Sequence, residues 1–380
     1  MLIFKFLYFA KGKMRYIIKT SLIVFGAFFF ALEISFSQEV LERGRFSGFM
    51  FGDYYYNILR DNNIASLPFA NFKDQQDQNG FEFRRIYFTY DYQISAKFNS
   101  RLRFEIENFS LTNNSKFAPF VKDAYLQWKD IFEGSNLTFG IQPTPTFDIS
   151  EYVWENRHLE MTIIDLYGFM SSRDFGISLK GKIDGDGIFN YWILFGNGAG
   201  VKPEYDRYKN IYGNLLFKPS ENIWAYVNYH HKFLKPLSNS FINGEKLSTD
   251  EDLLSLFFAY YLKDKFKVGF EGFSNFLRNN IKDTVNATYK NRQMIGISLF
   301  GIYYFSPKYN IVARFDYFDP NVKPESEGDR RFLYLLGFNY KPIDKVYISP
   351  VLLIEAFEKQ NGKSFKPSVT ARIVFFYIFL

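Results

Sequence analysis

The feature that most constrains the fold is a period-two alternation of apolar and polar side chains, which recurs along most of the chain from Phe46 onward. The clearest example is the run 101–107, where Leu102, Phe104 and Ile106 alternate with arginine and glutamate. Because successive side chains of a strand point to opposite faces of a sheet, this segment would have one charged face and one face suited to lipid.

About sixteen such segments occur, and the gaps between them alternate between short and long, which is typical of outer-membrane β-barrels. A closed barrel also pairs every backbone group inside lipid, which an open sheet cannot do. We therefore predict an all-β fold, a transmembrane antiparallel up-and-down β-barrel. Both termini of the barrel would lie on the periplasmic side. The predicted strands are 45–57, 80–94, 99–110, 119–129, 136–143, 173–183, 188–196, 207–217, 222–233, 251–262, 265–277, 291–305, 309–319, 329–341, 345–357 and 365–380.

The aromatic content supports the same class of fold. Aromatic residues make up 21% of the chain, with 48 Phe and 28 Tyr, and Tyr and Trp gather at the two interfaces of a membrane. A soluble β-sandwich is the alternative, but it would need a polar outer face and evenly spaced turns. The girdle residues that we expect near strand ends are Tyr54, Tyr55, Tyr56, Trp128, Tyr191, Trp192, Tyr260, Tyr261, Tyr303, Tyr304 and Tyr377.

The register of the last strand is open to two readings. Either Phe375, Tyr377 and Phe379 face lipid, or Phe376, Ile378 and Leu380 do. Arg372 favours the first reading, because it would then point into the lumen.

The first 37 residues have the pattern of a secretory signal peptide. A basic region is followed by an apolar stretch of about twelve residues and by the small-x-small site Ser35-Phe36-Ser37. This stretch is shorter than the ~20 residues that a membrane helix needs. We therefore predict cleavage, export to a Gram-negative outer membrane, and a barrel domain at 38–380. Met14 is an alternative start within this pattern.

Composition excludes several classes of function. Outside residues 1–37 the chain has 41 basic and 39 acidic residues, so it lacks the basic footprint of a nucleic-acid-binding protein. It has no cysteine, and its histidines are His158, His230 and His231. These histidines lack metal-ligand spacing, and a Gly-x-Ser-x-Gly nucleophile elbow is missing. We predict no catalytic residues, no metal and no cofactor.

The longest interruption of the alternation runs from Pro143 to Ser172 and follows the fifth predicted strand. Long loops in a regular framework are usually functional, and we expect this one to fold into the lumen and narrow it. The alternative is that its carboxylates cap helix ends or face outer solvent. The expected constriction residues are Asp148, Glu151, Glu155, Arg157 and Glu160, and the expected pore-wall residues are Arg85, Arg101, Arg103, Glu105 and Lys180.

Short motifs around this loop resemble the phosphate-selective porin O and P type outer-membrane porin family. The matching runs are Gly48-Phe-Met-Phe-Gly52-Asp53, Phe139-Gly-Ile-Gln142 with Pro143 and Pro145, Asn156-Arg157-His158-Leu159-Glu160, and Arg173-Asp174-Phe-Gly176. The resemblance implies a trimeric, anion-preferring porin of sixteen strands. The family's phosphate selectivity implies lysines at the constriction, whereas loop 143–172 contains none.

We therefore predict an outer-membrane porin with a water-filled channel for passive diffusion of small hydrophilic solutes and ions, anions such as phosphate among them. Its partners would be outer-membrane lipid, the diffusing solutes and two further copies of the chain in a homotrimer. Two alternatives remain open at this point. One is an outer-membrane transporter of hydrophobic substrates such as fatty acids, and the other is a closed structural or adhesive barrel.

Overall fold

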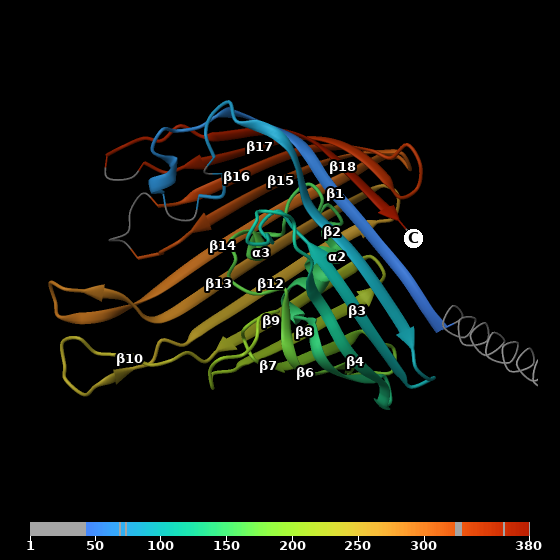
Figure 1. The fold of residues 1–380 in the computed structure, drawn as a ribbon, viewed down its shortest axis with the longest axis horizontal. Helices are drawn as coiled ribbons and strands as arrows, with labels where there is room; N and C mark the ends of the chain where they lie inside the picture. Colours follow the sequence, from blue (N-terminus) through green and yellow to red (C-terminus); the bar gives the residue numbers. More distant parts are fainter. Residues whose placement is uncertain (1–42, 68–69, 73, 324–328, 360–361, 380) are drawn as a thin grey trace, which may run out of the picture.

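The computed structural model describes residues 43–67, 70–72, 74–323, 329–359 and 362–379. These residues form a closed barrel of sixteen antiparallel strands, in which β1 pairs with β18 and every other barrel strand pairs with its neighbours in chain order (Figure 1). The predicted fold class and strand number are confirmed. The predicted signal peptide at 1–37 lies outside the described residues.

The barrel strands are β1 (Gly44–Leu59), β2 (Asn79–Gln93), β3 (Phe98–Ile106), β4 (Phe120–Phe132), β5 (Ser135–Pro143), β6 (Arg173–Lys182), β7 (Phe189–Gly196), β8 (Asn210–Ser220), β9 (Ile223–Lys232), β12 (Glu251–Leu262), β13 (Phe266–Asp283), β14 (Thr288–Ser306), β15 (Tyr309–Asp319), β16 (Arg331–Tyr340), β17 (Val346–Phe357) and β18 (Ser368–Phe379). Between β9 and β12, the short strands β10 (Leu237–Ser238) and β11 (Lys246–Leu247) pair only with each other.

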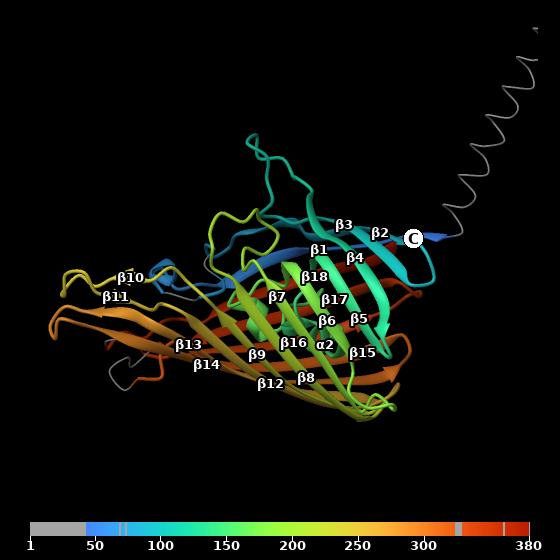
Figure 2. The same ribbon diagram turned by 90° about the horizontal axis from the view of Figure 1, so that it is seen from below.

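The two ends of the barrel differ in their connections. At one end the strands are joined by turns of two to six residues. The start of β1 and the end of β18 pair there, with Gly48 opposite Phe379 (Figure 2). We call this the short-turn end, and the opposite one the long-loop end.

The outer face of the barrel is apolar, as the alternation predicted. On β12, Leu254, Leu256 and Phe258 are each nearly half exposed, whereas Leu253 and Phe257 between them are 1% and 3% exposed inside the barrel. Leucine and phenylalanine side chains standing outward on successive strands give a surface that lipid can cover.

The last strand has the predicted register. Phe375 and Tyr377 point outward and are 45% and 39% exposed, while the side chain of Arg372 reaches Glu160 inside the barrel.

One predicted loop is wrong. We expected 278–290 to be a loop, but β13 continues to Asp283 and β14 begins at Thr288, with Ile281 opposite Lys290. This hairpin projects from the long-loop end beside β10 and β11 (Figure 1). Phe241, in the connection between β10 and β11, packs on Tyr289 with ring centroids 5.6 Å apart. Polar residues dominate the extension, so its sequence resembles a loop although its backbone groups pair.

Helices are few among the described residues and sit within the connections. The helices α2 (Pro145–Trp154) and α3 (Ile163–Leu166) lie between β5 and β6, and the 3-10 turn η1 (Ile64–Ser66) lies between β1 and β2. A proline in the first turn of α2 costs no hydrogen bond, and Glu155 ends the helix in the left-handed region with φ 56°.

Within the described part of the chain, no helix is long and apolar enough to cross a membrane.

Candidate functional site

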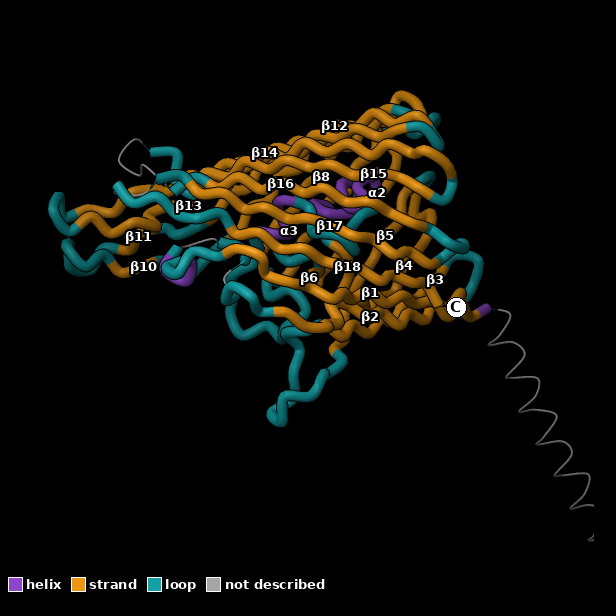
Figure 3. Tube along the Cα trace, turned by 90° about the horizontal axis from the view of Figure 1, so that it is seen from above, coloured by secondary structure: helices purple, strands orange, loops and turns teal. Residues whose placement is uncertain are grey.

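The connection 144–172 lies inside the barrel, where α2 and α3 appear behind the strands of the wall (Figures 1 and 3). Trp154, Leu159 and Ile163 are at most 1% exposed. Fully burying a large apolar side chain contributes about 1.5–3 kcal/mol, so this loop is held by packing.

The wall opposite these side chains is apolar on its inner face. Its inward residues come from β7 to β9 and from β12 to β18, and they form two clusters with the loop. One cluster joins Val153, Trp154 and Leu159 to Phe257, Phe300, Val312, Leu333, Leu335, Val351, Leu353 and Val374. The other joins Phe147, Ile163, Ile164 and Met170 to Leu194, Tyr212, Leu253, Phe273, Met294 and Phe318.

A glycine in the wall makes room for the loop. Gly337 on β16 faces Leu159, and a Cβ at position 337 would lie 2.8 Å from Leu159 Cδ1. Any side chain there would have to displace the leucine. The small residue therefore sets how closely the loop approaches β16.

Polar contacts fix the segment that follows α2. Arg314 on β15 forms an ion pair of 2.5 Å with Asp316 and donates a hydrogen bond to the carbonyl oxygen of Met161. Arg372 on β18 lies 3.2 Å from a carboxylate oxygen of Glu160, whose side chain is only 5% exposed. Glu160, which we expected at the constriction, is thus a buried contact between loop and wall.

Arg84 on β2 holds the same segment from the other side. It pairs with Asp53 at 2.5 Å and donates hydrogen bonds to the carbonyl oxygens of His158 and Leu159, the latter at 3.3 Å. Arg84 reaches the lumen because β2 has a bulge, in which Phe51 and Gly52 of β1 pair with Arg85 and Phe83 and leave the arginine as the extra residue.

A second bulge does the same for Lys122 on β4. Arg103 pairs with Asp123 and Phe104 with Val121, so the lysine is the extra residue, and its Nζ lies 2.7 Å from Glu105. Sequence reasoning missed both Arg84 and Lys122, because strict alternation assigns them to the apolar face. A basic residue at a lipid-facing position was the available signal for a bulge, since lipid strongly disfavours it.

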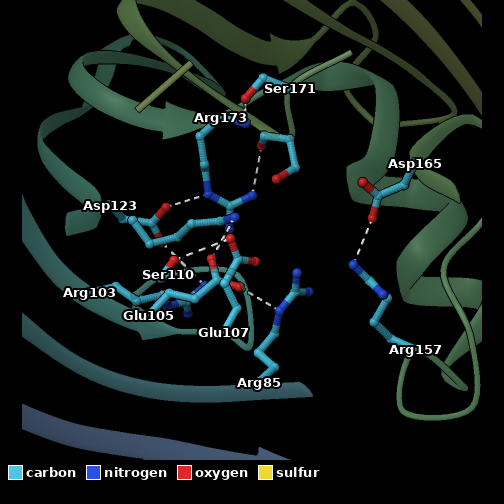
Figure 4. Close-up of polar contacts among 12 residues, drawn as sticks. Arg85, Arg103, Glu105, Glu107, Ser110, Asp123, Arg157, Asp165, Ser171 and Arg173 are labelled. Atoms are coloured by element: carbon cyan, nitrogen blue, oxygen red, sulfur yellow. Dashed lines mark hydrogen bonds and ion pairs between the residues drawn. The ribbon is translucent and has the colours of Figure 1, made fainter. Parts of the chain in front are cut away.

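The inner wall of β2 to β6 carries a cluster of paired charges (Figure 4). Arg85 pairs with Glu105 at 2.5 Å, and Arg103 with Asp123 at 3.2 Å. Arg173, at the start of β6, also pairs with Asp123. The predicted wall residues Arg85, Arg103 and Glu105 therefore lie together in this cluster. Asp123 from β4 and Arg173 from β6 complete it.

The loop presents its own charged group across the lumen from this cluster. Arg157 lies 3.2 Å from Glu151 and 2.8 Å from Asp165 (Figure 4). Among the described residues, no ion pair joins this loop group to Arg85 or Arg173. A cavity of about 260 Å³ that Arg85 and Arg157 both line is therefore bordered by guanidinium and carboxylate groups.

The other predicted constriction residues contact the wall near the short-turn end. Asp148 lies 2.8 Å from Lys180 on β6. Glu155 lies 2.6 Å from Lys267 on β13 and accepts a hydrogen bond from Tyr304 at 3.0 Å. Both pairs are partly exposed to the lumen, so solvent weakens them.

Basic side chains dominate the inner wall at the short-turn end. We call this set the basic mouth. The predicted wall residue Arg101 belongs to it and pairs with Asp91 at 2.6 Å. Cavities of about 310 Å³ and 750 Å³ open at this level beside β1–β4 and β6–β9. The basic mouth consists of Arg45, Arg101, Lys129, Lys180, Lys182, Lys218 and Lys267.

The space between the loop and β1 to β3 has no such excess of charge. This chamber of about 260 Å³ has four acidic and four basic residues in its lining, which makes it neutral in sum. They are Asp74, Glu82, Glu107 and Glu160, with Arg84, Arg85, Arg157 and Arg372.

A second connection also turns inward. Asn71, between β1 and β2, donates to Glu355 on β17 from its backbone nitrogen at 3.0 Å and from its side chain at 3.0 Å. Phe72 joins the apolar cluster around Leu159. Nothing in the sequence pattern indicated this contact.

The pKa values of His158 and Glu160, in loop 144–172 outside the strands, are both lowered. Burial lowers the pKa of His158 to about 4, although Asn339 at 3.2 Å partly opposes this. Burial alone would raise the pKa of Glu160, but Arg372 and Arg84 outweigh it and the pKa falls below its usual value. At neutral pH the loop thus carries a neutral imidazole and an ionised carboxylate at the wall.

No family model matches this chain, and no curated protein sequence matches it. Solved structures do resemble it. The outer membrane channel DcaP of Acinetobacter baumannii aligns with a TM-score of 0.63 at 10% identity, covering 88% of this chain and 97% of that one. The anion-selective porin from Comamonas acidovorans aligns at 0.60 and 12% identity, covering 88% and 99%. A mutant of the Rh. blastica porin aligns at 0.53 and 12%, covering 88% and 100%. At these identities the likeness concerns the fold.

Proposed function

We propose that this chain is an outer-membrane porin, a water-filled channel through which small hydrophilic solutes and ions diffuse passively. The observation that carries the proposal is that the two sides of the lumen differ. The loop 144–172 packs on the apolar wall and leaves a charged passage along β2 to β6. A sixteen-stranded barrel is wide enough to keep an aqueous channel after its side chains project inward, and the apolar outer face suits outer-membrane lipid.

The proposal includes a preference for anions. The basic mouth exceeds its acidic neighbours in number, whereas the chamber beyond the constriction is neutral in sum. Rings of charge in a pore select ions of the opposite sign. Phosphate specificity is not part of the proposal, because loop 143–172 carries no lysine.

In this proposal the site residues have three roles. Glu151 and Arg157 border the narrowest passage, opposite the wall cluster of Arg85, Arg103 and Glu105. Asp148 and Glu155 offset part of the positive charge of the basic mouth, which includes Lys180 and Arg101. Glu160 anchors the loop.

Reconstitution into a planar bilayer tests the proposal. We expect discrete conductance steps, and a reversal potential in a salt gradient whose sign indicates anion preference. Replacing Lys129, Lys182 and Lys218 together by glutamine should move that potential towards cations, and the matched triple replacement by arginine should leave its sign unchanged. A protein that inserts but never conducts would falsify the channel and favour the closed structural barrel.

Transport of hydrophobic substrates is disfavoured, because the apolar inner wall is covered by loop side chains. A homotrimer is proposed on the resemblance of motifs, and the mass of the detergent-solubilised protein, measured by light scattering, tests it. Export and signal cleavage are tested by sequencing the N-terminus of the protein isolated from outer membranes.

A further inference from the structure

The cavity of about 750 Å³ at the short-turn end has apolar residues in its lining that the channel proposal does not use. It lies between α2 and the strands β6 to β9. Ile149, Leu216 and Trp224 give it an apolar floor. Its charged lining is basic in sum, with Lys180, Lys182 and Lys218 against Asp186 and Glu221. A plain passage for inorganic ions has no need of such a floor.

Trp224, which lines this cavity, stacks with a tyrosine of the loop. Tyr152 on α2 lies on Trp224 with ring centroids 5.2 Å apart and an interplanar angle of 14°. Trp224 is 9% exposed, whereas Tyr152 is 64% exposed. The tryptophan therefore supports the tyrosine ring from below, and much of the tyrosine remains open to a solute.

Cations lie beside these rings. Lys218 Nζ is 4.2 Å from the centroid of the Trp224 ring, close enough for a cation–π contact. Lys180 is engaged by Asp148 at 2.8 Å. Within the described part of the chain, neither Lys182 nor Lys218 forms an ion pair, so both can interact with an anion that enters.

We infer that this cavity is a binding site for amphiphilic organic anions, which have an aromatic or aliphatic body and a single carboxylate, phosphate or sulfate end. The body would lie against Tyr152, Trp224 and Ile149, and the anionic end would reach Lys182 and Lys218. A small inorganic anion would leave the apolar floor unused, and a neutral solute would leave the lysines without a partner. The site would retain such anions on the diffusion path, so this inference rests on the proposed function.

Calorimetric titration of the full-length protein in detergent micelles tests the site independently of conduction. The probe is 3-phenylpropionate. Its matched controls are propionate, which keeps the charge without the ring, and 3-phenylpropan-1-ol, which keeps the ring without the charge. We expect saturable binding of 3-phenylpropionate, with both controls at least about tenfold weaker, since each lacks one of the two contacts.

Variants locate the binding. Y152A and K218Q should each weaken 3-phenylpropionate binding about fivefold, as expected for the loss of one aromatic or cationic contact. The control K129Q removes the same charge from a lysine that lines the neighbouring 310 Å³ cavity and not this one, and it should leave this affinity unchanged. Equal weakening by K218Q and K129Q would reduce the effect to general electrostatic attraction and overturn the site, as would an absence of saturable binding.

The two proposals fail in different ways. A channel that conducts with anion preference but binds no 3-phenylpropionate would overturn this inference alone. A protein that binds the probe but never conducts would overturn the porin proposal, and the cavity would remain as a binding site in a closed barrel.

Discussion

The two halves of the barrel wall use the same strand geometry for different purposes. The inner face of β2 to β6 carries charged residues that pair within the wall, such as Arg85 with Glu105. The inner face from β12 to β18 contributes an apolar cluster that packs on Trp154 and Leu159 of the loop. It also buries charged residues, Glu271 and Glu355 among them. The difference teaches that a charged surface can remain solvated, whereas an apolar one in a wide lumen must be covered by another element.

Two arginines on this half of the wall contact the loop. Arg314 and Arg372 both make contacts with the loop, the first with a carbonyl oxygen and the second with Glu160. Desolvated charges are costly unless they are paired. Arg314 and Arg372 therefore fix the position of the loop along the wall, which apolar packing specifies less sharply because it has no direction.

The largest expected effect comes from removing the main apolar contact of the loop. Trp154 is 1% exposed and donates a hydrogen bond to the carbonyl oxygen of Glu160 at 2.8 Å. Trp154→Ala should weaken docking by about 4 kcal/mol. We expect larger and noisier single-channel currents, and new proteolytic cleavage within 144–172. Trp128→Ala, which removes the same side chain from the outer face, should change neither.

The second largest effect is expected at the bulge in β2, which brings Arg84 into contact with the loop. Arg84→Met would leave Asp53 buried without its partner and remove two hydrogen bonds to the loop. The loss should be about 3 kcal/mol, measured by thermal unfolding in detergent. Adding Asp53→Leu should recover part of it, because the unpaired carboxylate is then gone. A single variant as stable as the wild type would contradict a supporting role for the bulge.

A steric change on the apolar half should have a somewhat smaller effect. Gly337→Val would place atoms where Leu159 Cδ1 now lies, and overpacking of this kind costs about 1–3 kcal/mol. The double variant with Leu159→Ala should regain stability, since the smaller loop residue restores the space. If Leu159→Ala and Gly337→Val simply add, the two residues are not in contact in solution.

Acidification should loosen the loop moderately. The pKa of His158 is about 4 when the loop is docked and near its ordinary value when it is free. Docking is therefore fully stable above about pH 6.5 and loses stability as the pH falls towards 4, because only the free loop binds the proton. At about pH 5.5 the loss should be roughly 1 kcal/mol. Current noise recorded against pH measures it, and His158→Gln should abolish the dependence in this window.

The smallest effect concerns the half-exposed charges of the loop. Replacing Asp148, Glu151 and Glu155 by their amides should raise the anion-to-cation permeability ratio about twofold, as expected for partly solvated charges. The reversal potential in a salt gradient measures the shift. In 1 M salt, where the screening length is about 3 Å, the shift should nearly vanish. An unchanged ratio at low salt would mean that these carboxylates do not line the passage.

The extent to which sequence predicted this molecule differs between strands and loops. Alternation identified sixteen strands and the inward position of Arg85, Arg101, Arg103 and Glu105. It could do so because the direction of a side chain in a regular strand depends only on whether its position is odd or even, which we call its parity. Parity failed at Arg84 and Lys122, where a bulge shifts the count by one residue. It also failed at the β13–β14 extension, where polar residues pair as strands.

The alternating pattern alone specifies a closed sheet with an apolar outer face, because a period of two is a local property of each strand. The tertiary structure decided which part of the wall receives the loop 144–172, since that choice depends on apolar side chains contributed by strands from β7 to β18 and brought together only when the barrel closes. It also decided that Glu160 is buried against Arg372, 212 positions away in the chain. No local pattern records a contact between residues so far apart.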